Sequence, residues 1–428
     1  MSSLKLRSRS FEPGPLRGTI SVPGDKSVSH RALMLAAAAA QPVEIRRLNP
    51  GRDVRATMEA LIALGARVEH ATDAVTIGAR SLHEPMGPLD CMNSGSTARM
   101  MLGVCAGADV PATFDGDESL RRRPMEPVAA QLRAFGAKIE TTGGKLPVRF
   151  EGTPRIETQR FILLSPSAQV KSALLLAGLF SKTPVTIFED RGSRDHTERL
   201  LTYLGADVTW DGKTIELRSG ITQANPIAVC GDFSAAAFFI VAATVAPGSE
   251  LTITDVGVNP TRTGLLDALL AMGAAIELRN PREQSGEPVA DLFVHHAPLH
   301  GTTIGPDVAL RAIDEIPVLA VAAAFAQGET KITGVRELRT KESDRLAAIE
   351  RLLSAVEIAV EVATNGLVIR GARPRATGAD IDTHDDHRIA MAAATLATGA
   401  GPLRIDSDAS IDVSFPSFLE TLGSVQRT

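Results

Sequence analysis

A short phrase recurs along the chain at intervals of about 70 residues, and an internal repeat of this kind limits the folds open to a sequence. Each copy has an apolar residue, usually followed by glycine and alanine, and then residues that alternate between polar and apolar. Because glycine accepts the left-handed conformation that closes a helix, the phrase predicts a helix that ends on glycine and continues as a strand. The copies are residues 64–69, 135–140, 204–209 and 272–277, with a weaker one at 355–361.

Six alanine-rich apolar segments keep step with this phrase, and each follows a polar cluster. Serine, aspartate and asparagine are good N-caps, so each cluster predicts a helix start. The small side chains inside these helices indicate close packing on all sides. The sequence therefore predicts an α/β fold of six repeated units, each of about 70 residues with strands and two helices. The clusters begin at Asp25, Asn93, Ser167, Asp232, Asp314 and Asp386.

The length and charge of the chain bound what it can do. It has 428 residues and a formal net charge of −5. The length predicts about two or three domains, and the negative charge argues against nucleic-acid binding, which usually needs a basic surface. Several buried helices whose N-termini face one cleft nevertheless attract negative charge, because backbone N–H groups and positive dipole ends point there. We therefore expect an anionic ligand.

The spacing of the cysteines and the length of the apolar runs indicate the cellular location of the protein. Cys91, Cys105 and Cys230 have no paired spacing, so neither a disulfide framework nor a zinc site is expected. The N-terminal residues lack the apolar stretch of a signal peptide. The most apolar runs, residues 235–246 and 317–326, are too short to span a bilayer. We expect a cytoplasmic protein that has no membrane partner.

The first two helix starts have the composition of an anion clamp. Lys26, Ser27 and Arg31 lie in the segment PGDKSVSHR, which offers an ammonium, a hydroxyl and a guanidinium at a helix start. The spacing is not that of a Walker A loop. In the segment NSGSTAR, Asn93 begins the cluster, and Gly95 lets a ligand approach the backbone closely.

Two further segments carry weaker signals. The run RRRP at residues 121–124 is of a kind that is usually solvated, although its proline can open a helix and one arginine can reach an anion. In the segment SPSAQ, Ser167 and Gln169 offer neutral hydrogen bonds to hydroxyl groups.

In the second half of the chain, carboxylates stand beside basic residues. Asp314 is a natural N-cap and also a candidate general base. Lys341 and Arg345 lie in a charged run that, taken alone, is better explained as an exposed helix face. They are four residues apart, so on a helix both would face one way and would repel each other unless an anion lay between them. Glu342 is a candidate second acid or base, and Arg388 is a candidate anion ligand.

The chain resembles the 3-phosphoshikimate 1-carboxyvinyltransferase family of enolpyruvyl transferases over essentially its whole length. The resemblance rests on PGDKSVSHR, NSGSTAR, RRRP, SAQVKSA, RDHTE, IDEIPVLAVAAAFA, ELRTKESDRL and DDHRIAMA, which occur in the family's order and spacing. It implies a two-domain inside-out α/β barrel built from six repeats, three in each domain. Residues 1–18 and 232–428 would form a discontinuous domain, and residues 19–231 would form a continuous inserted one.

The resemblance also implies the chemistry. A family member transfers the enolpyruvyl group of phosphoenolpyruvate to the 5-hydroxyl of shikimate 3-phosphate, in aromatic amino-acid biosynthesis, by addition and elimination through a tetrahedral intermediate. It is a target of glyphosate. We expect no metal, no organic cofactor and no nucleic-acid partner, and a monomeric enzyme.

Roles for single residues follow from the same resemblance. The expected catalytic residues are Asp314, Lys26 and Glu342. The expected ligands of shikimate 3-phosphate are Lys26, Ser27, Arg31, Ser167, Ala168, Gln169, Arg194, Asp314 and Lys341. The expected ligands of phosphoenolpyruvate are Lys26, Asn93, Gly95, Arg123, Gln169, Arg345 and Arg388.

The chain departs from many relatives at two positions, and other functions stay open. Ala168 stands where many relatives have serine, and Val413 where many have lysine. One alternative is the transfer of enolpyruvate to UDP-N-acetylglucosamine, although enzymes of that kind typically use a cysteine in the loop that spans residues 115–124, where this chain has none. Another alternative is a non-catalytic anion-binding protein on the same fold.

Overall fold

The computed structural model describes residues 8–78, 81–376 and 378–426, and the chain divides into two units. The terminal unit holds the chain up to Pro23, Gly231–Arg282 and the residues from Pro288 onward. The inserted unit holds Gly24–Cys230 together with Glu283–Glu287. The sequence placed the first boundary between residues 18 and 19. In the structure, β2 (Arg17–Ser21) pairs with β15 (Glu250–Gly257), so the terminal unit continues to Pro23.

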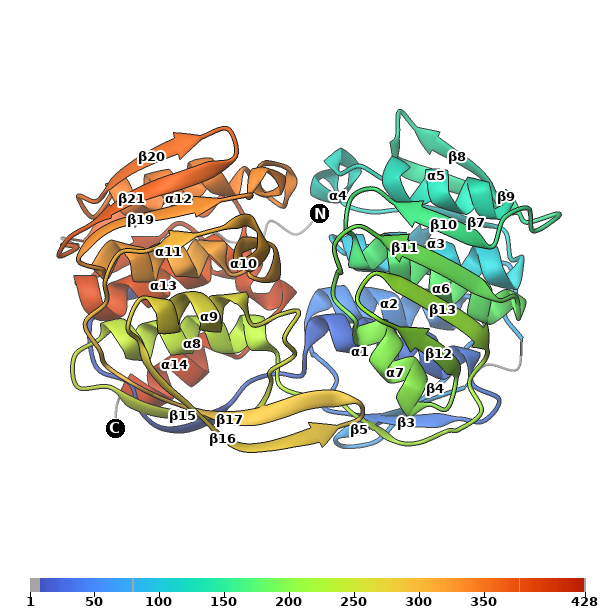
Figure 1. The fold of residues 1–428 in the computed structure, drawn as a ribbon, viewed down its shortest axis with the longest axis horizontal. Coiled ribbons are helices and arrows are strands. Elements are labelled where there is room, and N and C mark those ends of the chain that lie inside the picture. Colours follow the sequence, from blue (N-terminus) through green and yellow to red (C-terminus); the bar gives the residue numbers. More distant parts are fainter. Residues whose placement is uncertain (1–7, 79–80, 377, 427–428) are drawn as a thin grey trace. The chain divides into compact units, whose positions relative to one another are not determined.

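The inserted unit contains three repeats of strand, buried helix, strand, outer helix and two further strands (Figure 1). The first consists of β14 (Ile227–Ala228), α1 (Lys26–Ala38), β3 (Val43–Arg46), α2 (Arg52–Ala63), β4 (Arg67–His70) and β5 (Ala74–Gly78). The second consists of β6 (Leu89–Asp90), α3 (Gly95–Ala108), β7 (Ala112–Asp115), α4 (Glu118–Arg122), α5 (Glu126–Phe135), β8 (Lys138–Thr142) and β9 (Lys145–Gly152). The third consists of β10 (Arg160–Leu163), α6 (Ala168–Ser181), β11 (Val185–Glu189), α7 (His196–Tyr203), β12 (Asp207–Trp210) and β13 (Thr214–Ser219).

The terminal unit follows the same plan. Its first repeat consists of β2, α8 (Phe233–Val245), β15, α9 (Gly264–Ala271), β16 (Ala275–Gln284) and β17 (Glu287–His295). The second consists of β18 (Thr303–Ile304), α10 (Pro306–Arg311), α11 (Ile316–Phe325), β19 (Gly328–Thr333), the 3-10 turn η1 (Arg336–Thr340), α12 (Arg345–Ser354), β20 (Ala359–Ala363) and β21 (Gly366–Gly371). The third consists of β22 (Ala379–Ile381), α13 (His387–Ala400), β23 (Leu403–Ile405), the 3-10 turn η2 (Ala409–Val413), α14 (Phe418–Gln426) and β1 (Arg9–Phe11).

Among the described residues, five of the six sheets share one strand order. In β6-β7-β9-β8, for example, the first two strands are parallel and the rest of the sheet is antiparallel. A parallel pair needs a crossover connection, and the buried helix supplies it in the four repeats whose parallel strands follow each other in the chain. The sixth sheet, β1-β23-β22, has three strands and is completed by the N-terminal β1. The predicted α/β fold of six repeats is therefore confirmed.

Both units begin their first sheet with a strand from elsewhere in the chain. In the inserted unit, β14 pairs in parallel with β3, and Ile227 lies opposite Ile45. In the terminal unit, β2 pairs in parallel with β15, and Ile20 lies opposite Ile253. Each first repeat is thus completed by a strand that lies far away in sequence.

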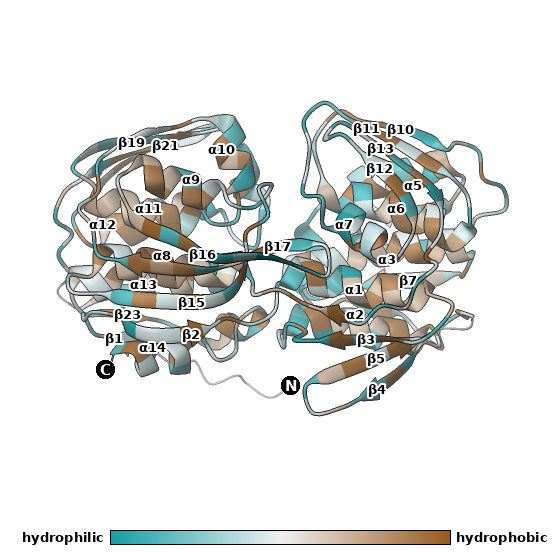
Figure 2. Cartoon of the chain, turned by 60° about the horizontal axis from the view of Figure 1, so that its bottom comes forward, coloured by the Kyte–Doolittle hydropathy of each residue, from teal (hydrophilic) through white to brown (hydrophobic). Residues whose placement is uncertain are grey.

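Three buried helices form the centre of each unit. Helices α1, α3 and α6 pack together in the inserted unit, and α8, α11 and α13 pack together in the terminal unit. Every residue of α8 is buried, and Figure 2 colours α8 and α11 largely hydrophobic. A helix that is apolar on all sides has to be buried on all sides. None of the described helices is long and apolar enough to cross a membrane.

The recurring phrase marks helix ends, as the sequence predicts. Its glycines have positive φ angles of 97° at Gly65, 120° at Gly136, 73° at Gly205 and 95° at Gly273. In the weaker fifth copy, Glu357 takes the same role with a φ of 64°. Each turn lets the chain leave its helix and enter a strand.

Gly136→Ala should destabilise the inserted unit by about 2 kcal/mol or more, because strain at this φ adds to a steric clash. A Cβ at this position would lie 1.9 Å from the backbone oxygen of Arg155. Gly143→Ala is the matched control, since its φ is 60° and no atom lies within 4 Å of the added Cβ. The control should cost only about 1–2 kcal/mol. Urea unfolding of both variants measures the difference, and equal midpoints would contradict the clash.

Candidate functional site

Four of the buried helices begin on the predicted capping residue. Asp25 accepts a hydrogen bond from the N–H of Val28 (2.9 Å), and Ser167, Asp232 and Asp386 cap α6, α8 and α13. The other two predicted starts are wrong in detail. Ser94, the residue after Asn93, caps α3. Helix α11 begins one residue later than expected, with Glu315 at the N-cap position and no side-chain cap, so the carboxylate of Asp314 is not used as a cap.

The first cation of the inserted unit is Lys26, at the start of α1. Its Nζ lies 2.9 Å from Oδ2 of Asp53, in the first turn of α2. Both side chains are largely buried, with 17% and 11% of their surface exposed. One turn further along, burial lowers the pKa of His30, and the charges of Lys26 and Arg31 lower it further. His30 is therefore neutral, and the positive charge at this helix start belongs to Lys26 and Arg31.

Arg31 is the second cation, and its guanidinium joins three helices. It donates to Oγ1 of Thr197 on α7 (2.8 Å), to Oγ of Ser172 on α6 (2.8 Å), and to the backbone oxygens of Ser27 and Ala168 (2.9 and 3.2 Å). Burial lowers the pKa of Arg31 to about 10; Glu198 opposes this, and the nearby charge of Arg194 adds to it. All four hydrogen-bond acceptors are hydroxyl or carbonyl oxygens, so they leave the charge of Arg31 able to attract an anion.

A third group of polar side chains surrounds the start of α3. Arg123 donates to the side-chain and backbone oxygens of Asn93 (3.1 and 3.4 Å). Gln169 donates to Oγ of Ser96 (3.0 Å) and accepts from Nη1 of Arg99 (3.0 Å). A Cβ on Gly95 would lie 2.6 Å from Nη1 of Arg99 and 3.2 Å from Nη1 of Arg123. The two guanidinium groups therefore converge on a glycine at a helix N-terminus.

The structure separates the three consecutive arginines. Arg121 pairs with Asp115 at 2.5 Å and Arg122 with Glu118 at 3.0 Å, and more than half of each arginine side chain is exposed. Only Arg123 turns toward α3. The run by itself could not single out this residue.

The remaining predicted residues of the inserted unit lie around the start of α6. The hydroxyl of Ser167 accepts from the N–H of Val170 (3.4 Å), and the backbone oxygen of Ala168 accepts from Arg31 and Ser172. Arg194 is half-buried in the segment before α7, and its charge acts on Arg31. The inserted unit thus gathers the predicted basic residues around the N-termini of α1, α3 and α6.

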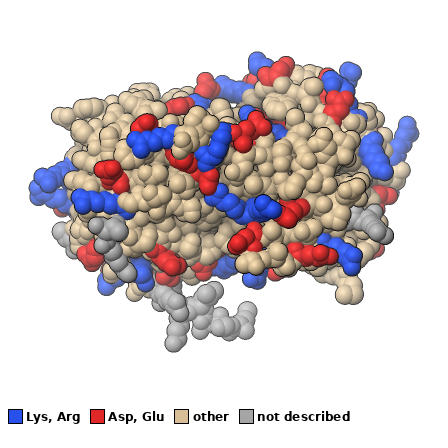
Figure 3. All heavy atoms as spheres, turned by 90° about the horizontal axis from the view of Figure 1, so that it is seen from below, with Lys and Arg blue, Asp and Glu red and all other residues tan. Residues whose placement is uncertain are grey.

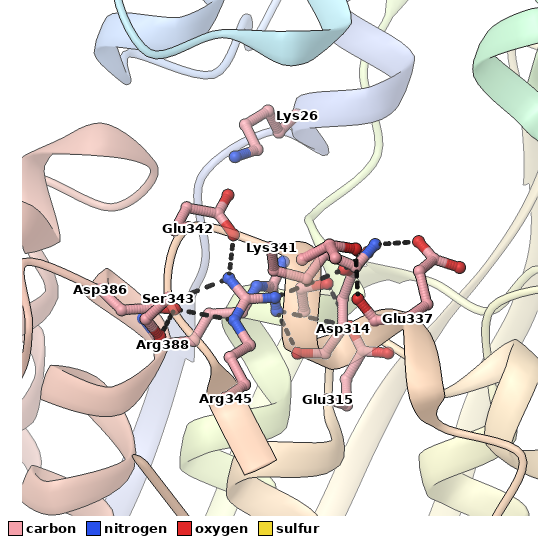
Figure 4. A network of polar contacts seen from close by, with 12 residues as sticks. Lys26, Asp314, Glu315, Glu337, Lys341, Glu342, Ser343, Arg345, Asp386 and Arg388 are labelled. Atoms are coloured by element: carbon pink, nitrogen blue, oxygen red, sulfur yellow. Dashed lines mark hydrogen bonds and ion pairs between the residues drawn. The ribbon is translucent and has the colours of Figure 1, made fainter. Parts of the chain in front are cut away.

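The terminal unit holds a compact network of charges around Arg345, the first residue of α12 (Figure 4). Its Nε lies 2.8 Å from Oδ2 of Asp386, and its Nη2 lies 2.6 Å from Oε2 of Glu342. Ser343 also donates to Asp386 (2.9 Å). Burial opposes the charge on Arg345, but Asp386 and Glu342 outweigh it and raise its pKa. In the same way, burial opposes the charge on Asp386, and Arg345 lowers its pKa nevertheless.

Asp314 lies at the edge of this network with three cations around its carboxylate. Its Oδ1 is 3.9 Å from Nζ of Lys341 and 3.8 Å from Nη1 of Arg345, and its Oδ2 is 3.8 Å from Nη1 of Arg262. Arg388 donates to the backbone oxygen of Asp314 (2.8 Å). About a fifth of the Asp314 side chain is exposed, at 19%, so a ligand can reach it. Three cations therefore face one partly exposed carboxylate.

The terminal unit therefore gathers all five residues that the sequence predicted for it, namely Asp314, Lys341, Glu342, Arg345 and Arg388. The prediction that Lys341 and Arg345 lie on one helix was wrong. Lys341 follows η1 and precedes α12, so it does not share a helix with Arg345. Both cations face Asp314 because the chain turns between them.

Sequence reasoning missed several residues that hold the site together. Asp53, Ser172, Thr197 and Arg99 each bond a predicted residue from a different helix, and Arg262 contacts Asp314 from the segment before α9. The repeat pattern is the one sequence signal that could have pointed to these residues, because they lie in or next to the helices of the repeated units. Among the described residues, no group of three or more His, Cys, Asp or Glu side chains is placed to hold a metal ion.

Comparisons with known proteins give one consistent family. The sequence model of the EPSP synthase (3-phosphoshikimate 1-carboxyvinyltransferase) family matches residues 11–422. A 3-phosphoshikimate 1-carboxyvinyltransferase of Desulforudis audaxviator is 47% identical over 420 residues, covering 96% of this chain and 97% of its own. The structure of EPSP synthase from Acinetobacter baumannii matches at 37% identity with a TM-score of 0.87, covering 98% of both chains. The enolpyruvyl transferase NikO from Streptomyces tendae, 18% identical with a TM-score of 0.71, shares the fold.

Gly95→Ala should leave the inserted unit folded, because the atoms nearest to the added Cβ belong to the flexible ends of Arg99 and Arg123. Gly103→Ala on the same helix is the contrasting variant, since its Cβ would lie 2.2 Å from the backbone oxygen of Ala173 on α6. We expect a loss of about 2 kcal/mol or more for Gly103→Ala, and less than about 1 kcal/mol for Gly95→Ala. Thermal unfolding followed by circular dichroism tests this. Equal loss in both variants would show that the backbone at Gly95 is as confined as that at Gly103.

Proposed function

The chain belongs to the EPSP synthase family, the 3-phosphoshikimate 1-carboxyvinyltransferases, and we propose that it transfers the enolpyruvyl group of phosphoenolpyruvate to the 5-hydroxyl of shikimate 3-phosphate. It is a transferase. The observation that carries the proposal is the partly exposed carboxylate of Asp314 with three cations within 4 Å. Such a group can accept a proton from a hydroxyl while Lys341 and Arg345 contact the substrates.

The reaction has two steps. In the addition, the 5-hydroxyl oxygen attacks C2 of phosphoenolpyruvate, its proton passes to Asp314, and a second proton is delivered to C3. The product is a tetrahedral intermediate with a methyl group. In the elimination, the bond from C2 to the phosphate oxygen breaks, phosphate leaves, and one methyl proton is removed to restore the double bond.

Lys26 and Glu342 are the residues that deliver a proton to C3 and later remove one from it. The ammonium of Lys26, paired with Asp53 at 2.9 Å, is a proton donor. Glu342 bonds the buried guanidinium of Arg345 at 2.6 Å, which holds its carboxylate in place to accept the methyl proton. We assign the donor role to Lys26 and the acceptor role to Glu342.

The other predicted residues bind the substrates' charges and hydroxyl groups. For shikimate 3-phosphate these are Lys26, Ser27, Arg31, Ser167, Ala168, Gln169 and Arg194 in the inserted unit, with Asp314 and Lys341 in the terminal unit. For phosphoenolpyruvate these are Lys26, Asn93, Gly95, Arg123 and Gln169 in the inserted unit, with Arg345 and Arg388 in the terminal unit. The buried positions of Arg31 and Arg345 hold their guanidinium groups in place before a ligand arrives.

The proposal extends to the setting of the enzyme. We propose a cytoplasmic monomer whose partners are its two substrates, with no nucleic-acid or membrane partner. The helices that the structure describes include none long and apolar enough to cross a membrane. Acidic and basic side chains are interspersed on the face shown in Figure 3, whereas nucleic-acid-binding proteins usually concentrate basic ones.

Phosphate release tests the proposed function. The purified chain is mixed with shikimate 3-phosphate and phosphoenolpyruvate, and UDP-N-acetylglucosamine replaces shikimate 3-phosphate in a parallel reaction. We expect release only with shikimate 3-phosphate. Release only with UDP-N-acetylglucosamine would favour the cell-wall reaction, and tight binding of shikimate 3-phosphate without release would favour a non-catalytic protein.

Asp314→Asn should retain the affinity for shikimate 3-phosphate and lower kcat by about 10²–10⁴-fold, because the amide cannot accept the hydroxyl proton. Asp307→Asn, on an exposed residue of α10 in the same unit, is the matched control and should keep the wild-type kcat. Calorimetry and phosphate release measure the two quantities. A kcat close to wild type in Asp314→Asn would remove Asp314 from the proton transfer.

Arg123→Gln should raise the KM for phosphoenolpyruvate by about 10–100-fold, the cost of losing a charged hydrogen bond. Arg122→Gln removes a neighbouring arginine that pairs with Glu118 and is largely exposed, so its KM should stay at the wild-type value. Steady-state kinetics at saturating shikimate 3-phosphate compares the two. A similar rise in both variants would point to the general charge of the arginine run rather than to Arg123.

A further inference from the structure

We propose that Arg262 is a positioning residue that holds the carboxylate of Asp314 in place for proton transfer. This inference rests on the proposed function of Asp314. Arg262 lies in none of the sequence motifs that point to the site, in the segment between β15 and α9. Its place in the structure nevertheless connects it directly to the carboxylate on which the proposed reaction depends.

The backbone around Arg262 is held by a buried turn. The N–H of Arg262 donates to the backbone oxygen of Asn259 (2.8 Å), and the side chain of Asn259 accepts from the N–H and the hydroxyl of Thr261 (2.9 and 2.8 Å). Asn259 and Arg262 are 2% and 3% exposed. The turn therefore directs the arginine side chain inward from a fixed point.

The guanidinium of Arg262 reaches the starts of two buried helices. Its Nη2 donates to Oγ of Ser234 (2.7 Å) and lies 3.4 Å from Oδ1 of Asp232, both at the start of α8. Its Nη1 lies 3.8 Å from Oδ2 of Asp314 and 3.9 Å from Oε1 of Glu315, both immediately before α11. One planar group thus links the two helix starts.

The contacts of Asp314 show what the link does. Lys341 and Arg345 face Oδ1 of Asp314, whereas Arg262 faces Oδ2. The next residue, Glu315, is buried, and like charges on adjacent carboxylates repel each other. Arg262 lies within 4 Å of both and offsets that repulsion. Without Arg262, only the cations that face Oδ1 would hold the carboxylate of Asp314 against this repulsion.

The charge balance also explains why an arginine is buried there. A buried charge is costly unless it is paired and hydrogen-bonded. Arg262 has carboxylates of Asp232, Asp314 and Glu315 within 4 Å and a hydrogen bond to Ser234, which itself donates to Glu315. Of these carboxylates, Asp314 is the most exposed, at 19% against 7% and 0% for the other two side chains. The network therefore presents one carboxylate toward a ligand and keeps the others inside.

The test is a double-mutant cycle on kcat with Arg262→Lys, Asp314→Asn and the double variant. Lysine keeps the buried charge but cannot contact both helix starts with a planar fork. We expect Arg262→Lys to lower kcat by about 10–100-fold, since misplacing a reacting group by about 1 Å can cost that much. In the Asp314→Asn background, the same change should alter kcat by less than about threefold, because residues that act as a unit are not additive. The affinity for shikimate 3-phosphate should change little.

Arg311→Lys is the matched control. Arg311 donates to the backbone oxygen of Pro260 in the same segment and pairs with Asp267 (3.1 and 2.6 Å), and it is partly exposed. The kcat of the Arg311→Lys variant should equal that of the wild type. If Arg262→Lys does not fold, Ser234→Ala replaces it in the cycle, because it removes the hydrogen bond to Nη2 without burying a charge.

Two outcomes would overturn the proposal, and they differ. If the wild-type chain releases phosphate but the effects of Arg262→Lys and Asp314→Asn on kcat multiply, Arg262 acts independently of Asp314 and is not its positioning residue. If the wild-type chain releases no phosphate from the two substrates, the proposed function fails and this inference fails with it.

Discussion

Helices that are apolar on every side have to be buried on every side, and this requirement organises both units. In the terminal unit, α8, α11 and α13 fill the centre, and sheets cover them. Inside each helix the backbone groups bond one another, and only the N–H groups at its start and the carbonyl groups at its end lack partners within the helix. Polar residues at the starts of α8 and α13 accept hydrogen bonds from these N–H groups. The arrangement that builds the core therefore also gathers polar and charged groups at one end of it.

Small residues make this packing possible. In the inserted unit, Gly103 and Gly107 of α3 face the backbone of α6, and a Cβ at either position would lie 2.2 or 2.3 Å from a backbone oxygen. Close packing brings the helix starts near one another, so Gln169 on α6 can bond Ser96 on α3. A larger side chain between the helices would separate these groups. The geometry of the site thus depends on residues that contact no ligand.

Burying a charged group is costly in free energy, and the site offsets this cost by pairing buried charges with opposite ones. Arg345 is 1% exposed and Asp386 is 0% exposed, and each holds the other in its charged form. Breaking one partner of such a pair is strongly destabilising, whereas the intact pair adds little to stability. The pair instead fixes the orientation of the two side chains. Arg345 and Arg262 both reach Asp314 from positions that packing and hydrogen bonds have already set.

The sequence by itself determined the repeats, the apolar helices and the identity of most charged residues. These follow from local patterns, since glycine ends a helix and an all-apolar helix is buried. The tertiary structure alone decided which charges meet. Asp53 and Thr197 are ordinary polar residues until α2 and α7 bring them to Lys26 and Arg31. Arg262 and Asp314 are 52 residues apart in the chain, and Lys341 reaches the same carboxylate from a turn rather than a helix. Contacts of this kind depend on how separate helices and turns pack, within a repeat or between repeats, and no local sequence pattern encodes them.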